Sequence, residues 1–226
     1  MIRWEHLGTA SVPDGGGELR LMRRGQEFSI MAPGGIELMN SRLSGSEEAL
    51  AKLAIERVGA EGHVLVGGYG MGFTLRAALA GMGPRGHCTV AELMPEIIAW
   101  ARGPMAEVAA GCLDDPRVTL RMGDVGDAIL LAPDPFDAIL LDVDNGPDGV
   151  VREENNRLYS KAGLHNARKA LAPGGLLAVW SAFPDPKFTR RLSDVGFDVE
   201  EVEVRARYDA NGKGKGPRHV IWFARV

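Results

Sequence analysis

A glycine-rich turn between an apolar run and a helix pattern constrains this chain most. Residues 63–79 begin as a β-type run, pass through glycines 67, 68, 70 and 72, and continue as an amphipathic helix pattern. Glycine removes side chains where a ligand must approach the backbone, and the first turn of a helix offers free N–H groups to a polar ligand. The pattern is typical of a cofactor-binding turn in an open α/β sheet.

The next predicted strand, 88–93, carries an acid near its end, Glu92. A carboxylate in this place can accept hydrogen bonds from both hydroxyls of a ribose, so we expect an adenosine cofactor. The dinucleotide fingerprint G-x-G-x-x-G fails, because Phe73 and Leu75 occupy its third position in the two possible registers. Residues 68–72 read G-x-G-x-G instead. A glycine-rich tight turn without a ligand is the alternative.

Three later segments continue the pattern of strands and helices. A turn and strand over 115–122 lead into Gly123 and Asp124, and the apolar strand 136–141 is followed by Asp142 and Asp144. A helix pattern over 158–171 then leads into a strand at 176–180. Strands this apolar suit the centre of a parallel sheet, whose carboxyl ends face the ligand crevice.

The order and spacing of these segments, roughly 63–180, resemble the spermidine synthase family. The turn also resembles motif I of the class I S-adenosylmethionine-dependent methyltransferases. The resemblance implies an α/β fold with a doubly wound, mostly parallel sheet of the Rossmann-like class I methyltransferase type. It implies a small N-terminal β-hairpin unit over 1–45, with short strands at 18–23, 27–31 and 36–39, and a cofactor domain over 46–226 whose first helix begins near Ser44.

The same resemblance assigns roles to particular residues. Asp142 matches the family's catalytic acid, and Glu47, Asp144 and Asn145 are the candidates for binding the acceptor. The cofactor, S-adenosylmethionine or its decarboxylated form, is expected to contact Gly67, Gly68, Tyr69, Gly70, Gly72, Glu92, Leu93, Gly123, Asp124, Val125 and Asp142. Asp142 is a useful base only if its pKa is raised, and the alternative is that it caps a loop or binds the cofactor's amino group. We expect Tyr69 to lie exposed in the turn and to point toward a ligand.

Two departures from the family bear on the reaction. The family's D-E-x-x-Y-H-E motif, which holds a polyamine, has no Tyr or His in the corresponding stretch 40–48, and Arg42 is expected to repel a cationic amine. The family's turn reads G-G-G-D-G-G, and Gly70 replaces its acid. Two like charges about 4 Å apart repel by about 4 kcal/mol at an effective dielectric of about 20, so losing this acid favours a cofactor that keeps its carboxylate.

The leading prediction is therefore methyl transfer from S-adenosylmethionine to a small molecule. The alternatives are an aminopropyltransferase that uses decarboxylated S-adenosylmethionine and a non-catalytic nucleoside-binding protein. The resembling family suggests a homodimer. Five scattered histidines predict no metal site.

Composition adds limits on partners and compartment. The formal net charge of -4 argues against general nucleic-acid binding, although the basic loop 211–219, between two predicted strands, leaves an RNA contact as a minor alternative. No apolar run approaches the ~20 residues of a membrane span, and the polar residues 1–6 do not suggest a leader. Two cysteines without C-x-x-C spacing suit a reducing cytoplasm.

Overall fold

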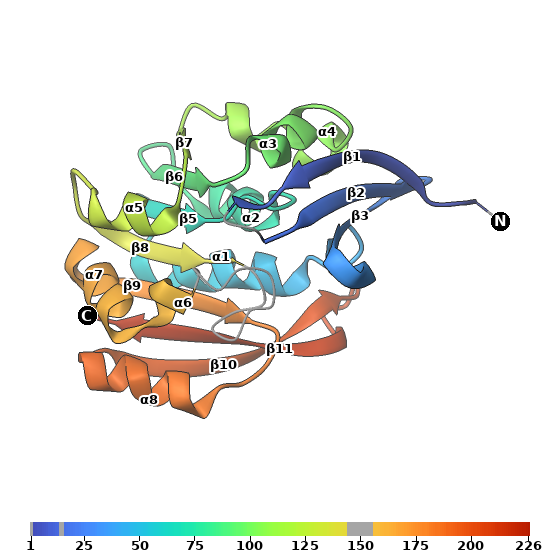
Figure 1. The fold of residues 1–226 in the computed structure, drawn as a ribbon. Helices are drawn as coiled ribbons and strands as arrows, with labels where there is room; N and C mark the ends of the chain where they lie inside the picture. Colours follow the sequence, from blue (N-terminus) through green and yellow to red (C-terminus); the bar gives the residue numbers. More distant parts are fainter. Residues whose placement is uncertain (1, 14–15, 144–155) are drawn as a thin grey trace.

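The computed structural model describes residues 2–13, 16–143 and 156–226, which form two sheets (Figure 1). The strands are β1 Glu5–Ser11, β2 Glu18–Arg24, β3 Glu27–Ala32, β4 Ile36–Asn40, β5 His63–Gly67, β6 His87–Glu92, β7 Val118–Met122, β8 Phe136–Leu141, β9 Leu171–Ser181, β10 Asp198–Tyr208 and β11 Gly214–Arg225. The helices are α1 Gly45–Val58, α2 Phe73–Gly81, α3 Pro95–Arg102, α4 Ala106–Ala109, α5 Val125–Leu130, α6 Asn156–Tyr159, α7 Lys161–Ala170 and α8 Pro186–Val195.

The larger sheet has seven strands in the order β10-β11-β9-β8-β5-β6-β7. Strands β5 to β9 run parallel, and β11 and β10 complete the sheet in antiparallel pairing. The chain starts at β5 in the middle, builds outward through β6 and β7, and then returns to add β8 on the other side of β5. This reversal creates the crevice between β5 and β8 in which open α/β sheets bind ligands. The expected doubly wound, mostly parallel sheet is confirmed.

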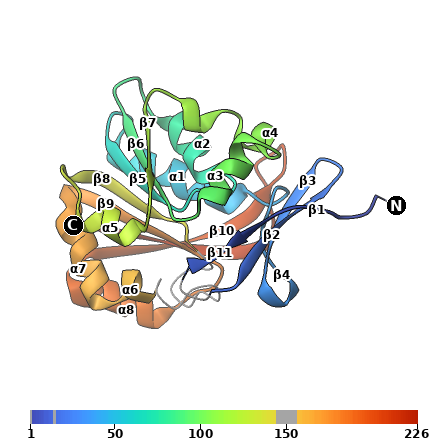
Figure 2. The ribbon, with the colours of Figure 1, turned by 45° about the horizontal axis from the view of Figure 1, so that its top comes forward.

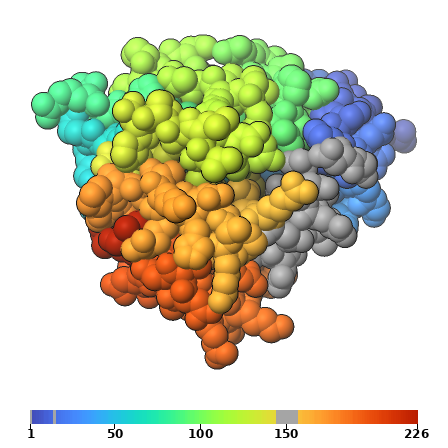
Figure 3. All heavy atoms as spheres, turned by 60° about the vertical axis from the view of Figure 1, so that its left-hand side comes forward, coloured from blue at the N-terminus to red at the C-terminus, as the bar shows by residue number. Residues whose placement is uncertain are grey.

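Helices cover both faces of this sheet, which explains why its central strands are so apolar. Successive side chains of a strand point to opposite faces, so Val64 and Val66 pack with α1, α2 and α3 while Leu65 packs with α5, α7 and α8. Figure 3 shows the second of these faces, where the residues of α5 in yellow-green meet those of α7 and α8 in orange. Two apolar cores therefore hold the sheet in place from its two sides.

The smaller sheet is an antiparallel meander of β1 to β4 in chain order. It confirms the three short strands predicted between residues 18 and 39 and adds β1, which the sequence analysis missed. In Figures 1 and 2 this sheet lies at one end of the molecule, with β1 beside α3 and α4. A Cβ at Gly8 would lie 2.7 Å from Nε1 of Trp100 on α3, so the lack of a side chain lets β1 pack against that helix.

The C-terminal strands form the expected hairpin, and its far end packs onto the start of α1. A Cβ at Gly45 would lie 3.0 Å from the Cα of Arg207 and 3.0 Å from the ring of Tyr208. The hairpin and the first turn of α1 therefore touch, although they are far apart in sequence. Among the described residues, no helix is both long and apolar enough to cross a membrane.

Candidate active site

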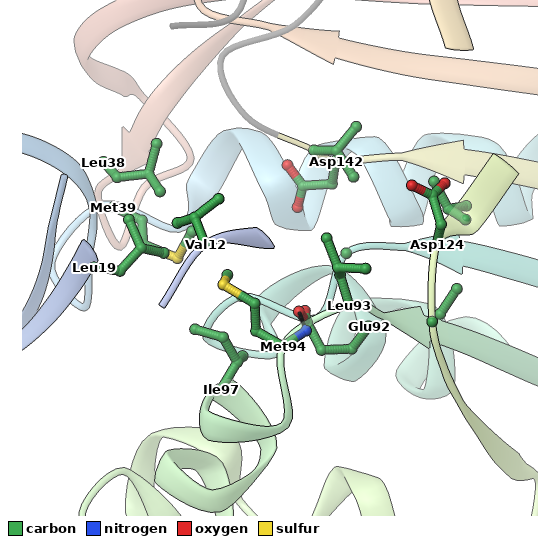
Figure 4. A pocket seen from close by; sticks show the side chains of 16 residues that line it. Val12, Leu19, Leu38, Met39, Glu92, Leu93, Met94, Ile97, Asp124 and Asp142 are labelled. Carbon is green, nitrogen blue, oxygen red and sulfur yellow. Dashed lines mark hydrogen bonds between the residues drawn. The ribbon is translucent and has the colours of Figure 1, made fainter. Parts of the chain in front are cut away.

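A cavity of about 110 Å³ lies at the carboxyl ends of β5, β6, β7 and β8, and the N-terminal sheet forms its far wall (Figure 4). The residues that line the cavity change in character from one end to the other. Asp124 lies at one end, Glu92 and Leu93 lie in the middle, and apolar side chains close the other end. The crevice that the strand order predicts is therefore a real pocket in the described structure.

Glu92 lies in the middle of the pocket at the end of β6, and only 5% of its surface is exposed. One of its carboxylate oxygens accepts the N–H of Tyr69 at 2.9 Å, and the other accepts the N–H of Met94 at 2.9 Å. Burial raises the pKa of Glu92, while these backbone N–H groups act to lower it. The turn and β6 therefore hold the carboxylate in one orientation.

The end of β7 supplies further residues that are expected to contact the cofactor. Asp124 precedes α5 and accepts the N–H of Gly126 at 2.7 Å, which caps the helix. Gly123, before it, has a φ of +139°, in a region that favours glycine. Leu93 and Val125 add apolar surface on either side. Four residues expected to contact the cofactor, Leu93, Gly123, Asp124 and Val125, therefore line the cavity.

Asp142 follows β8 and lines the cavity opposite Glu92 (Figure 4). Its carboxylate accepts a 2.5 Å hydrogen bond from the hydroxyl of Thr74, in the first turn of α2. Burial raises its pKa, and the bond from Thr74 acts to lower it. Gly68 makes this arrangement possible, because its φ is +84° and a Cβ there would lie 2.7 Å from the carbonyl oxygen of Asp142.

Glu47, in the first turn of α1, is electrostatically coupled to Asp142. Burial is the main cause that raises the pKa of Glu47, and the negative charge of Asp142 raises it further. Two carboxyl groups with raised pKa values keep a proton to a higher pH than a lone surface carboxyl does. Glu47 is not part of the described pocket wall.

The far end of the pocket is apolar, and the sequence analysis did not identify it. Leu19, Leu38 and Met39 come from the N-terminal sheet, Val12 follows its first strand, and Ile97 comes from α3. A Cβ at Gly70 would lie 3.2 Å from the sulfur of Met39, so this side chain occupies the space that an acid at position 70 would need. The only signal in the sequence is the alternation of Leu19 and Leu21 in β2, which predicts a buried face but not what it covers.

One expectation for the glycine turn, the exposure of Tyr69, is wrong. Tyr69 is not exposed: 4% of its surface is accessible, and its hydroxyl lies 3.4 Å from the sulfur of Cys112. A Cβ at Gly72 would meet the Tyr69 hydroxyl at 2.6 Å, and one at Gly67 would meet Val125 at 2.8 Å. Gly67, Tyr69 and Gly72 do not line the described pocket. The left-handed conformations of Gly68, Gly70 and Gly72 turn the Tyr69 ring into the core.

Arg42 does not face the pocket as an unpaired cation. Its guanidinium forms a salt bridge to Glu37 at 3.3 Å, and its side chain is 40% exposed. Asp144 and Asn145 lie outside the described residues. Within the described part of the chain, no group of three or more His, Cys, Asp or Glu side chains could hold a metal ion.

Comparisons with known proteins agree with this architecture. No family model matches the chain. The polyamine aminopropyltransferase of Mycobacterium tuberculosis (strain ATCC 25618 / H37Rv) is 34% identical over 172 residues, which are 74% of this chain and 31% of that protein. Ribosomal RNA small subunit methyltransferase H of Xylella fastidiosa (strain Temecula1 / ATCC 700964) is 34% identical over 127 residues, 56% of this chain and 38% of that protein.

Two solved structures of spermidine synthase share the fold. The enzyme from Thermotoga maritima has a TM-score of 0.74, and a spermidine synthase in complex with the transition state analogue AdoDATO has a TM-score of 0.72. Each is 18% identical and covers 97% of this chain and 72% of the other. The chain is spermidine synthase-like and has the class I methyltransferase-like fold. It spans about a third of the length of the two curated relatives described above.

Proposed function

We propose that this chain is an adenosyl-cofactor-dependent transferase that moves an aminopropyl group from decarboxylated S-adenosylmethionine to an amine. The sequence left two alternatives to methyl transfer, an aminopropyltransferase and a non-catalytic nucleoside-binding protein. The comparisons favour the aminopropyltransferase, since relatives named polyamine aminopropyltransferase match the largest part of the chain. Methyl transfer, the leading prediction from the sequence, has weaker support. The observation that carries the proposal is the carboxyl pair of Asp142, which lines the pocket, and Glu47, whose pKa the charge of Asp142 raises.

The charge of the pocket favours a cofactor without a carboxylate. Its described wall contains three carboxylates, Glu92, Asp124 and Asp142, and no Lys, Arg or His. Decarboxylated S-adenosylmethionine ends in an ammonium group, which Asp142 attracts. Intact S-adenosylmethionine would bring its own carboxylate toward Asp142 and Glu47. Like charges about 4 Å apart repel by about 4 kcal/mol at an effective dielectric of about 20. The loss of an acid at Gly70 therefore does not leave this end of the pocket free of negative charge.

The glycine turn also offers few free donors to a carboxylate. The N–H of Gly68 donates to the carbonyl of Ala91 at 3.0 Å, and the N–H of Gly72 donates to the carbonyl of Tyr69 at 2.8 Å. The N–H of Tyr69 donates to Glu92 at 2.9 Å. The backbone N–H groups that could receive a methionine carboxylate at these three positions are thus already used within the protein.

The carboxyl pair supplies the proton transfer that an amine acceptor requires. The acceptor arrives as an ammonium ion, gives its proton to a carboxylate of the pair, and its nitrogen lone pair attacks the terminal carbon of the aminopropyl group bound to sulfur. The carbon–sulfur bond breaks, its electron pair stays on sulfur, and methylthioadenosine leaves as a neutral thioether. A base with a pKa raised toward working pH suits this step. Positioning of the two reactants in line supplies the rest of the rate.

Methyl transfer is the second candidate, because Gly70 lacks the acid of the resembling family and a methyltransferase is among the relatives. The two candidates differ in cofactor and in product mass. We would measure Kd for both cofactors by calorimetry, then incubate each with putrescine, cadaverine and spermidine and detect products by mass spectrometry. Tighter binding of the decarboxylated cofactor and an aminopropyl adduct support the proposal. Methylated product from S-adenosylmethionine alone would replace it with the second candidate.

The variant Gly70→Asp sharpens this test, combined with Met39→Ala because the Met39 sulfur occupies the space that a side chain at 70 would take. A restored acid should strengthen binding of the decarboxylated cofactor relative to S-adenosylmethionine. The single variant Met39→Ala is the matched control for the enlarged pocket. An unchanged ratio of the two Kd values in the double variant would show that the cofactor's ammonium end does not reach this turn.

A further inference from the structure

A short chain of hydrogen bonds leads from the carboxyl pair to the surface of the C-terminal hairpin. The hydroxyl of Ser46 lies 2.6 Å from a carboxylate oxygen of Glu47. The same hydroxyl lies 2.8 Å from Nδ1 of His219, a residue 173 positions away on β11. Both distances are typical of good hydrogen bonds. A single hydroxyl therefore connects the acid beside Asp142 to an imidazole on a different element.

The two ends of this connection differ in burial. Ser46 has no exposed surface, whereas His219 is half-buried and reaches solvent. The ring of Trp180 packs edge-on against the imidazole, with 4.8 Å between ring centroids, and helps to fix its orientation. A hydroxyl has one proton and two lone pairs, so Ser46 donates to one neighbour while it accepts from the other. Such a group can pass a proton along by reversing both bonds.

We infer that Glu47, Ser46 and His219 form the route by which the proton taken from the acceptor amine leaves the active site. The inference rests on the proposed function, which requires one proton to be removed in each turnover. The proton moves in three transfers. Protonated Glu47 gives its proton to the Ser46 oxygen, Ser46 gives its own proton to Nδ1 of His219, and the imidazolium releases a proton from Nε2 to water. His219 is a positioning and relay residue and does not touch the reacting atoms.

The surroundings of His219 suit a proton acceptor. Burial lowers its pKa, so the ring is neutral near pH 7 and offers a lone pair. Three elements surround the imidazole. It contacts Ser46 of α1, which is next to Glu47, and the ring of Trp180 on β9. Its strand partner on β10 is Val204. The charged neighbours on the two strands are Arg218, Glu203 and Arg205. Arg218 pairs with Glu203 at 3.1 Å, and Arg205 donates to the carbonyl of Gly216 at 3.2 Å.

A separate route is needed because the pocket is filled during the reaction. Bound cofactor and acceptor displace water from around Asp142, and burial is the main cause of the raised pKa of both carboxyl groups. A proton that remained on the pair would block the next deprotonation. The Ser46 hydroxyl contacts both Glu47 and His219 of the C-terminal hairpin. A proton can therefore leave Glu47 toward the hairpin while the substrates fill the pocket.

Turnover experiments test the route through its kinetics. Ser46→Ala and His219→Ala should lower kcat by tenfold or more at pH 7, while KM for the acceptor and Kd for the cofactor stay within twofold. Added imidazole should restore kcat in His219→Ala but not in Ser46→Ala. His165→Ala, which removes an exposed histidine on α7, is the matched control and should behave as wild type. Unchanged kcat in both relay variants, or loss of cofactor binding together with kcat, would overturn the inference.

A second measurement does not depend on turnover. The tautomer and pKa of His219 are followed by NMR of the ¹⁵N-labelled imidazole in wild type, Glu47→Gln, Ser46→Ala and the neighbouring control Glu48→Gln. A connected chain predicts that Glu47→Gln and Ser46→Ala change the His219 titration and that Glu48→Gln does not. If wild type transfers no aminopropyl group but shows this coupling, only the proposed function fails. If wild type is active and the coupling is missing, the relay is wrong.

Discussion

The hydroxyl of Thr74 donates a 2.5 Å hydrogen bond to Asp142 across the junction between α2 and β8. Thr74 belongs to the helix that follows the glycine turn, and Asp142 follows a strand that comes 68 positions later. The bond is short because its acceptor is a carboxylate, which makes stronger hydrogen bonds than a neutral oxygen. It also stabilises the charged form of the acid that we place at the reacting end of the cofactor.

Thr74→Val should shift the pH dependence of transfer. Removing the bond raises the pKa of Asp142 further, because burial is no longer opposed by the hydroxyl. A net bond energy near 1 kcal/mol corresponds to a shift of about one pH unit. The acid limb of the kcat/KM profile should therefore move to higher pH by about that amount. Thr119→Val, on β7, is the control, and an identical profile in both variants would show that Asp142 does not govern the limb.

Glu47→Gln should stabilise the folded protein at alkaline pH. Folding raises the pKa of Glu47, so the native state keeps a proton that the unfolded state has lost, and stability falls as the pH rises from about 4.3 through the raised value. Glu47→Gln removes this loss of stability, because glutamine carries no titratable proton. We expect the free energy of unfolding at pH 8 to rise by about 1–3 kcal/mol, with little gain at pH 4.

Urea titration of wild type, Glu47→Gln and the neighbouring Glu48→Gln at both pH values measures this effect. The gain should belong to Glu47→Gln alone and should be accompanied by a large fall in kcat. Equal behaviour of Glu47→Gln at pH 4 and pH 8 would contradict the raised pKa and remove the support it gives to the carboxyl pair.

Glu92→Gln should weaken binding of every adenosyl ligand, because the ribose hydroxyls lose a charged acceptor. We expect a loss of about 1.5–3 kcal/mol per bond at most. The amide also places an NH₂ group against the N–H of Tyr69 or Met94, so the free protein loses stability as well. Calorimetry with methylthioadenosine, alongside urea unfolding without ligand, separates the two effects. Wild-type affinity in a folded Glu92→Gln protein would mean that the ribose binds elsewhere.

Gly68→Ala and Gly72→Ala form a matched pair. Both positions have nearly equal left-handed φ angles, +84° and +83°, so an alanine costs similar backbone energy at each. Only Gly68 lines the pocket, where a Cβ would press on the carbonyl oxygen of Asp142. We expect both variants to lose stability and only Gly68→Ala to lose cofactor affinity, measured by calorimetry at 10 °C. Equal affinity losses would place the cofactor against Gly72 after all.

The local features of the cofactor site could be predicted from the sequence. The glycine turn, Glu92 at the end of the next strand and Asp124 before its helix all belong to single strand–turn–helix units, whose geometry depends on neighbours along the chain. Asp142 was predicted for the same reason, since it follows an apolar strand whose carboxyl end must face the crevice. The strand order then brings the turn and these three carboxylates to one edge of the sheet.

Contacts between distant segments were decided only by the tertiary structure. The bond from Thr74 to Asp142, the apolar wall from the N-terminal sheet, and the approach of His219 to Ser46 each depend on how separate elements pack. Tyr69 shows the limit most clearly: a residue between glycines in a turn predicts exposure, but three left-handed glycines direct its ring toward Cys112. Backbone preferences are set by the residues themselves, whereas a side chain's partners depend on which distant surface the fold brings beside it.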